Sequence, residues 1–280
     1  MKTHAITNTM GRRALLIGLS LVAAATGGFG AASADSVSDI KAKGKVVIGI
    51  QGDNPPWGFV NTSGVQEGFD AEIGNAFAQH LGVKAEFVPL AVANRIPALT
   101  TGRVDVLFAT MAMLPDRAKA VQYSKPYVAN IIYLLGAKTD TIKTNADMAK
   151  FTIAVPSASV QDTQITKNAP EGTKILRFAD DAAAIQALIS GQVQAVGGNM
   201  FYIDRLDKAK PGAFETKLEF TRLHNGACTK LGDKELNAEL NTFIDKIKAN
   251  GTLAAAYAKW MKVPVPEFAT SVEGVPFTVN

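Results

Sequence analysis

Strand-like and helix-like segments alternate twice along this chain, and this alternation constrains its fold more than any single motif does. The first round consists of a strand, a helix, a strand, a short helix and a strand, expected at residues 45–50, 70–81, 83–88, 95–101 and 104–108. The second round repeats that order, at residues 151–155, 157–166, 174–178, 180–190 and 193–197. The pattern predicts an α/β protein with two lobes, each a mainly parallel sheet flanked by helices.

Helix boundaries are also marked in the sequence. Asp70 is the expected N-cap of the helix over 70–81, and Gly82 is its expected C-terminal glycine. A longer helix over 234–250 places its apolar residues on one stripe. After a short final helix, the proline-containing tail from Val263 onward is expected to run over the surface.

The N-terminus has the features of a secretory signal. Three basic residues, Lys2, Arg12 and Arg13, precede a short apolar run and a small-x-small cleavage site that ends at Ala34. We therefore expect residues 1–34 to be removed as a signal peptide and the protein to reach the periplasm. Both the general secretory route and the twin-arginine route stay open.

Charge and cysteine content exclude several function classes. Removing the signal, which carries three basic and no acidic residues, lowers the formal net charge from +4 to +1, so we expect no nucleic-acid binding. Cys228 is the single cysteine and cannot form an internal disulfide. No Cys/His cluster has metal-ligand spacing, and no glycine-rich phosphate loop occurs, so neither a metal nor a cofactor is expected. A monomer is expected.

The segments that follow the predicted strands are candidates for a ligand site, because open α/β sheets bind ligands outside the carboxyl ends of their strands. These segments, at 52–59, 109–117, 157–161 and 198–199, are rich in small or polar residues. Arg117 closes one of them. Its planar guanidinium can donate two parallel hydrogen bonds to a carboxylate and stays charged.

In order and spacing, a series of short pieces resembles the polar-amino-acid solute-binding proteins of ABC importers, family 3 of the bacterial extracellular solute-binding proteins. The pieces lie at 47–50, 55–57, 67–73, 96–99, 102–105, 115–117, 123–127, 187–193, 250–253 and 259–260. The resemblance implies a two-lobe flytrap that closes on its ligand about a two-strand hinge. Lobe one would comprise residues 35–136 plus 223–280 and lobe two residues 137–222, with the hinge near 134–137 and 221–225.

The resemblance also implies roles for individual residues. Arg117 would clamp the ligand α-carboxylate, with further hydrogen bonds from Thr110 and the main chain of Ala112. Ser159, in lobe two, would reach the same carboxylate. Trp57 is the expected aromatic wall of the site, and the alternative is a core tryptophan beneath the turn formed by two prolines.

Asn199 is the largest departure from the family pattern, because members commonly have an aspartate there that pairs with the ligand ammonium. Either another acid takes its place, with Glu67, Asp53 and Asp181 as candidates, or the ligand is not an ordinary α-amino acid. Asn199 itself can still accept a hydrogen bond, but it brings no charge.

Arg95 lies in a run that resembles glutamate- and aspartate-binding members, where this arginine meets the side-chain carboxylate. Asp181 argues against an acidic ligand, because it occupies the place where those members have a histidine. The two residues together could hold a polar or zwitterionic side chain, and a surface role for Arg95 also stays open.

The sequence therefore predicts a non-enzymatic receptor that delivers an amino acid or related small carboxylate to an ABC permease. The alternative is an enzyme like cyclohexadienyl dehydratase on the same scaffold, with Glu67, Asp181 or Glu171 as acid or base. A detached sensory module is a third possibility.

Overall fold

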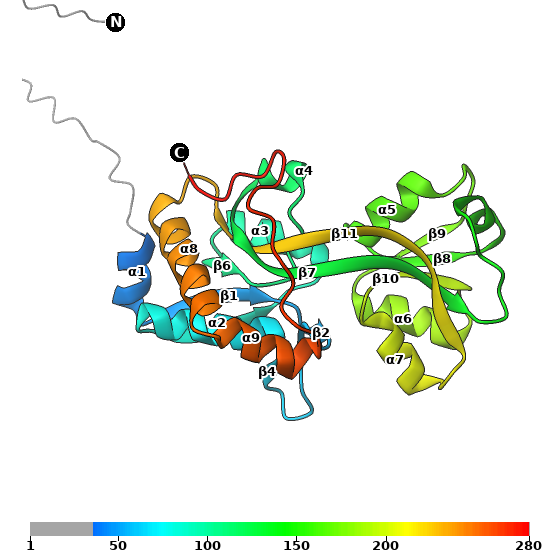
Figure 1. Cartoon of the computed structure of the whole chain (residues 1–280), viewed down its shortest axis with the longest axis horizontal. Coiled ribbons are helices and arrows are strands. Elements are labelled where there is room, and N and C mark those ends of the chain that lie inside the picture. Colours follow the sequence, from blue (N-terminus) through cyan, green and yellow to red (C-terminus); the bar gives the residue numbers. More distant parts are fainter. Residues whose placement is uncertain (1–35, 280) are drawn as a thin grey trace, which may run out of the picture. The chain divides into compact units, whose positions relative to one another are not determined.

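Two long antiparallel strands, β7 (Val121–Ala137) and β11 (Phe214–Lys230), run side by side through the middle of an eight-stranded sheet (Figure 1). On one side β11 pairs with β6, and on the other side β7 pairs with β10. The computed structural model describes residues 36–279, which lie within the unit Asp35–Asn280. The predicted signal peptide at 1–34 lies outside the described residues.

We call the elements on the β6 side lobe one. Its parallel strands have the order β5-β1-β6, and a small three-stranded sheet, β2-β3-β4, accompanies them. The strands are β1 (Lys45–Ile50), β2 (Asp53–Asn54), β3 (Gly58–Val60), β4 (Gln66–Glu67), β5 (Lys84–Pro89) and β6 (Val106–Leu107). The helices are α1 (Ser36–Lys43), α2 (Phe69–Leu81), η1 (Val92–Asn94), α3 (Arg95–Thr100), α4 (Pro115–Ala118), α8 (Lys234–Ala249), α9 (Thr252–Ala256) and η3 (Tyr257–Met261).

The elements on the β10 side form lobe two, with the parallel strand order β10-β8-β9. Its strands are β8 (Ile153–Pro156), β9 (Ile175–Phe178) and β10 (Ala195–Asn199). Its helices are η2 (Asn145–Lys150), α5 (Val160–Asn168), α6 (Asp181–Ser190) and α7 (Tyr202–Ala209). Figure 1 shows α5, α6 and α7 gathered around these strands, with β7 and β11 leading back to lobe one.

The core of lobe one confirms the apolar stripe predicted over 234–250. In α8, Leu240, Phe243 and Ile244 are buried, and Phe243 contacts Phe77 of α2 with ring centroids 5.2 Å apart. Burying one such side chain stabilises the fold by about 1.5–3 kcal/mol. No helix among residues 36–279 is long and apolar enough to cross a membrane.

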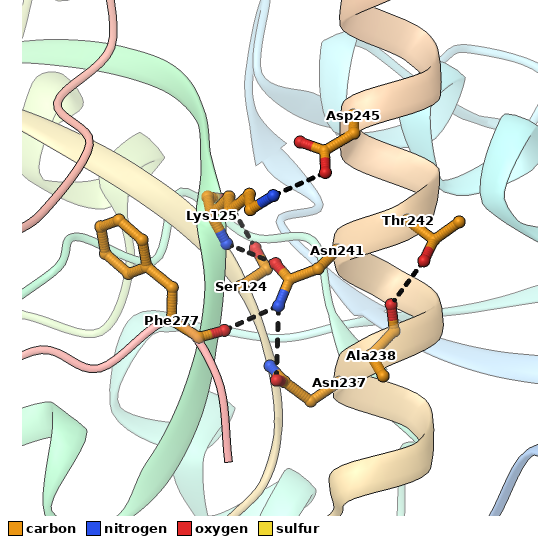
Figure 2. Close-up of polar contacts among 8 residues, drawn as sticks. All are labelled: Ser124, Lys125, Asn237, Ala238, Asn241, Thr242, Asp245 and Phe277. Carbon is orange, nitrogen blue, oxygen red and sulfur yellow. Dashed lines mark hydrogen bonds and ion pairs between the residues drawn. The ribbon is translucent and has the colours of Figure 1, made fainter. Parts of the chain in front are cut away.

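The C-terminal tail is fastened to this core by amides of α8 (Figure 2). The side chain of Asn241 accepts a hydrogen bond from the Lys125 N–H of β7 and donates one to the Phe277 carbonyl, both at 2.7 Å. Lys125 also forms an ion pair with Asp245, one turn further along α8. A single buried amide thus joins a sheet strand, a helix and the tail.

The expected N-cap at Asp70 is wrong. Helix α2 begins at Phe69, and its N-cap is Gly68, whose φ of 117° lies in the left-handed region that favours glycine. Asp70 is instead fully buried in the first turn, where its carboxylate accepts hydrogen bonds from other segments. The C-terminal glycine was predicted correctly, because Gly82 adopts the left-handed conformation at the end of α2.

The two rounds of strand and helix are confirmed, but of the strands that connect them only short hinge segments near 134–137 and 221–225 were predicted. β7 and β11 unite both parallel sets into a continuous sheet, and α7 was also missed. Residues 132–136 of β7 pair with β10 of lobe two as well as with β11, whereas residues 128–131 of β7 pair with β11 alone. The lobe boundaries and the hinge stay predictions.

Candidate functional site

A cavity with an empty volume of about 360 Å³, part of it open to solvent, lies where both lobes meet the crossing strands. It is lined by Gln51, Asn54, Val92, Arg95, Thr110, Ala112, Arg117, Asn130, Ile132, Ser159, Val160, Gln161, Asp181, Asn199 and Leu223. Most of these residues follow the carboxyl ends of parallel strands or begin the next helix, which is where the sequence placed the site.

Six of the seven residues that the sequence singled out line this cavity: Arg95, Thr110, Ala112, Arg117, Ser159 and Asn199. Trp57 does not. Its side chain has no exposed surface and belongs to the core of lobe one, with edge contacts to Phe69 and Phe201. The expected aromatic wall is therefore corrected to the alternative, a core tryptophan, because a fully covered indole presents no face to a ligand.

Arg117 links the two lobes across the cavity. Pro115 starts the short helix α4 directly after the run that follows β6, and this turn directs the arginine toward lobe two. Its Nη2 donates a hydrogen bond to the Ala158 carbonyl at 3.2 Å. The remaining N–H groups of the fork leave it able to bind a carboxylate of a ligand held between the lobes.

Arg95, the first residue of α3, is buried and only partly satisfied. Its Nη1 donates to the Ala109 carbonyl at 2.7 Å and to Thr110 Oγ1 at 3.2 Å. Its Nε and Nη2 have no partner, although both atoms are buried. Burial lowers the pKa of Arg95 to about 10, so the guanidinium remains charged at neutral pH. These unpaired donors are free to bind an acceptor in the cavity.

Thr110 is held in a left-handed conformation, with φ at 47°, which a β-branched residue rarely adopts. Its N–H donates to Asp70 Oδ2 at 3.2 Å, and its hydroxyl donates to Gln51 Oε1 at 3.0 Å. Asp70 also accepts from the Tyr127 hydroxyl at 2.7 Å. Burial raises the pKa of Asp70 to about 6. Sequence reasoning missed this positioning role of Asp70.

Ala112 offers only its main chain. Met113 N–H donates to the His224 carbonyl and Gly226 N–H to the Met111 carbonyl, so Ala112 faces Asn225 of β11 in a non-hydrogen-bonded pair. In such a pair the backbone N–H points away from the partner strand. This geometry leaves the Ala112 N–H directed away from β11.

Ser159 begins helix α5 as its N-cap. Its hydroxyl oxygen accepts the Asp162 N–H at 3.0 Å, and the side chain is buried against the cavity. The N-terminus of a helix carries a partial positive charge and free N–H groups, both of which favour an anion. The Arg117 guanidinium from lobe one and the positively polarised N-terminus of α5 from lobe two therefore both border the cavity.

Asp181 provides the cavity's carboxylate. It is the first residue of α6 and is buried, with hydrogen bonds from the Tyr202 hydroxyl, Asn54 Nδ2 and Gln51 Nε2. Burial, and to a lesser extent the nearby negative charge of Asp53, raises the pKa of Asp181 to about 6. Among residues 36–279, it is the one acid that lines the cavity.

The other candidate acids lie elsewhere. Asp53 of lobe one accepts a hydrogen bond from the Ala182 N–H of lobe two at 2.9 Å. Glu67 lies in a separate surface groove, where its carboxylate accepts a hydrogen bond from the Asn61 side chain. Asn199 donates to Asn54 Oδ1 at 3.3 Å and accepts the Phe201 N–H. It is thus the last residue of β10, where its side chain holds the following turn, and it is also part of the cavity wall.

Several lining residues escaped the sequence analysis. Asn130, Ile132 and Leu223 come from β7 and β11. Leu223 falls within the predicted hinge segment 221–225 but was not singled out as a site residue, and Asn130 and Ile132 lie outside the predicted hinge segments. Asn54 and Gln161 fall within the segments predicted to edge the cleft, but they were not singled out. Among the residues that the structure describes, no group of three or more His, Cys, Asp or Glu side chains could hold a metal ion.

The chain is similar to known binding proteins over most of its length. It is 27% identical to the L-cystine-binding protein TcyJ of Escherichia coli strain K12, covering 91% of this chain and 97% of the relative. The solved receptor for L-cysteine of Neisseria gonorrhoeae is 32% identical, with a TM-score of 0.76, covering 80% of this chain and 93% of that one.

A third similarity is to an ancestral amino acid-binding protein, AncCDT-1, described as a precursor of cyclohexadienyl dehydratase. It is 30% identical, with a TM-score of 0.75, covering 80% of this chain and 99% of that one. These neighbours and the sheet topology confirm the predicted α/β fold with two lobes. The model of the bacterial extracellular solute-binding proteins, family 3, matches residues 46–263, and the chain belongs to this family.

Proposed function

We propose that this protein is the periplasmic receptor of an ABC importer and that it binds a small amino acid or related carboxylate between its lobes. Membership of family 3 and the amino-acid ligands named for its relatives support this function. The observation that carries it is Arg117, which reaches from lobe one to the start of α5 in lobe two. A carboxylate placed there meets positive groups from both lobes, so its binding favours the closed arrangement.

In this proposal the lobes move about the crossing strands. Besides the ring contact of Trp57 with Phe201, the lobes touch through a few polar contacts: Arg117 with Ala158, Asp53 with Ala182, and the cluster around Asp181. Such contacts are individually weak, about 1 kcal/mol each, and they can open without loss of the core. We place the flexible points where β7 and β11 pair only with each other, at residues 130–131 and 222–223. The closed monomer then delivers its ligand to the permease.

Calorimetric titration with a panel of amino acids tests the function. We expect one ligand per chain with a Kd of about 1 µM or lower, equivalent to roughly −8 kcal/mol. Arg117→Ala should abolish detectable binding, whereas Arg103→Ala, which removes an exposed arginine outside the cavity lining, should leave it unchanged. If Arg117→Ala binds as tightly as the unaltered protein, the site assignment is wrong.

An enzymatic role like that of cyclohexadienyl dehydratase is the second candidate. It is favoured by one observation, a buried cavity carboxyl, Asp181, whose pKa near 6 suits an acid or base at neutral pH. Incubation with prephenate or arogenate separates the two functions. Appearance of the aromatic product, and its loss in Asp181→Asn, would establish the enzyme, and absence of product leaves the receptor.

A further inference from the structure

Asn199, at the end of β10, is uncharged, and the acid that lines the cavity, Asp181, lies on a different element. β10 ends in a neutral amide, whose Nδ2 donates to Asn54, and Asn54 in turn donates to Asp181 at 3.2 Å. The negative charge on this wall therefore lies on α6 rather than on β10. The chain Asn199, Asn54, Asp181 shows that both positions belong to one polar cluster.

Within this polar cluster, the carboxylate of Asp181 has neither a full set of hydrogen bonds nor a hydrogen-bonded cation. Asp181 can accept about four hydrogen bonds, and it receives three from Tyr202, Asn54 and Gln51. All three donors are neutral, so no cation is hydrogen-bonded to this buried carboxylate. A buried charge that lacks a directly bound counter-charge is costly, and the raised pKa of Asp181 reflects that cost.

The neighbouring guanidinium points to the second part of the ligand. Asp181 is the strongest attractive charge acting on Arg95, and yet no hydrogen bond joins the two side chains. Arg95 leaves its Nε and Nη2 unpaired while its side chain is 97% covered. A molecule placed between them would have to present a donor cation to one and an oxygen acceptor to the other.

We propose that Asp181 is the counter-charge for a cationic nitrogen of the ligand and that the ligand also carries a side-chain oxygen that accepts hydrogen bonds from Arg95. This inference rests on the proposed receptor function and names the ligand class of that site: an amino acid whose side chain contains a carboxylate, carboxamide or other oxygen acceptor. In this chain the cation partner is therefore Asp181 at the start of α6, and not the residue at the end of β10, Asn199. Arg117 and Ser159 remain for the α-carboxylate.

A thermal-shift and calorimetric screen of the twenty standard amino acids plus L-cystine tests the oxygen requirement. We expect the tightest ligand to bear a side-chain oxygen and to bind at least about tenfold more tightly than norleucine, because norleucine would leave the Arg95 donors unpaired. If the tightest ligand has no side-chain oxygen, the assignment of Arg95 is overturned. If no amino acid binds, this inference fails, and the proposed function fails with it unless a related small carboxylate binds.

A ligand–residue cycle tests Asp181. The tightest ligand and analogues that each lack one cationic nitrogen are titrated into the unaltered protein and into Asp181→Asn. In the unaltered protein, one analogue should lose at least about tenfold in affinity, and that loss should disappear in Asp181→Asn. Melting temperatures of the variant confirm that it is folded.

Asp53→Asn is the matched control, because Asp53 is a nearby carboxylate outside the cavity lining whose field reaches both Asp181 and Arg95. Asp53→Asn should preserve the full difference in affinity between the ligand and the analogue that lacks the cationic nitrogen. If Asp181→Asn also preserves that difference, Asp181 is not the cation partner, although amino-acid binding by the unaltered protein still supports the receptor function.

Discussion

The backbone N–H of Thr110 donates to the carboxylate of Asp70 at 3.2 Å, although the two residues lie 40 positions apart in the chain. This bond fixes Thr110 in the left-handed region, where its hydroxyl meets both Gln51 and Arg95. A strained backbone at a binding site persists only when its surroundings hold it there. Asp70 is thus a positioning residue for the cavity, acting from beneath it.

Asp70 should make the stability of the protein depend on pH in a particular direction. Burial raises its pKa from 3.8 in the unfolded chain to about 6, against the opposing effects of Tyr127, Thr110 and Arg95. Between these values the folded protein binds more protons than the unfolded chain, so the contribution of Asp70 to stability increases as pH falls from 7 toward 4. The full effect is roughly 3 kcal/mol.

Urea denaturation of the unaltered protein and of Asp70→Asn at pH 7 and pH 4.5 measures this effect. The free energy of unfolding of the unaltered protein, relative to the variant, should be higher at pH 4.5. Surface acids with lowered pKa values, such as the half-buried Asp147 and the exposed Glu219, have the opposite pH dependence but are common to both proteins. A difference that is constant or smaller at pH 4.5 would contradict the burial argument.

Ligand affinity should show the opposite dependence on pH. Asp181 faces Asp53 of β2, Arg95 of α3, and Tyr202 and Arg205 of α7, and its pKa is about 6. If its carboxylate binds a cationic nitrogen, protonation competes with the ligand. Affinity should therefore fall about tenfold from pH 7 to pH 5. Calorimetry on Asp181→Asn should give a flatter profile, and an equal fall in both proteins would assign the effect to another group.

The cavity positions that depend on local sequence could be located from the sequence. Arg117 follows a strand and a proline-started turn, and Ser159 starts a helix, so both positions are marked within a few residues of themselves. The lobes were predicted for the same reason, since each strand and helix has its own periodic pattern. Gly82 needed only its neighbours to be assigned as a helix end.

The parts that depend on distant segments could not be located in this way. Aspartate is a residue type that often caps helices, so the local sequence around Asp70 predicts an N-cap. Its actual partners, Tyr127 and Thr110, are distant in the chain, and local sequence does not reveal them. Trp57 is covered by Phe69 and Phe201, and the latter lies 144 positions away on lobe two. β7 and β11 pair over their whole length across more than 70 intervening residues, and no local pattern encodes that register.

Ser159 has a structural role that can be separated from its proposed ligand contact. Ser159→Ala removes the N-cap hydrogen bond to Asp162 N–H and should lower the free energy of unfolding by about 1 kcal/mol without ligand. Ser159→Thr keeps the hydroxyl and should lose much less. If Ser159 also binds the carboxylate, calorimetry will show weaker binding for the alanine variant than for the threonine variant, and equal affinities would limit Ser159 to the cap.

The corrected position of Trp57 makes it a reporter of lobe movement. Its ring lies against Phe69 of lobe one and Phe201 of lobe two, whereas Trp260 contacts Phe59 and Glu72 of lobe one alone. The chain has two tryptophans, so Trp260→Phe leaves only Trp57 emission. That emission should shift when ligand is added, because closure changes the contact with Phe201. In Trp57→Phe, the remaining Trp260 should respond little, and an equal response in both variants would mean that the lobes do not separate at Phe201.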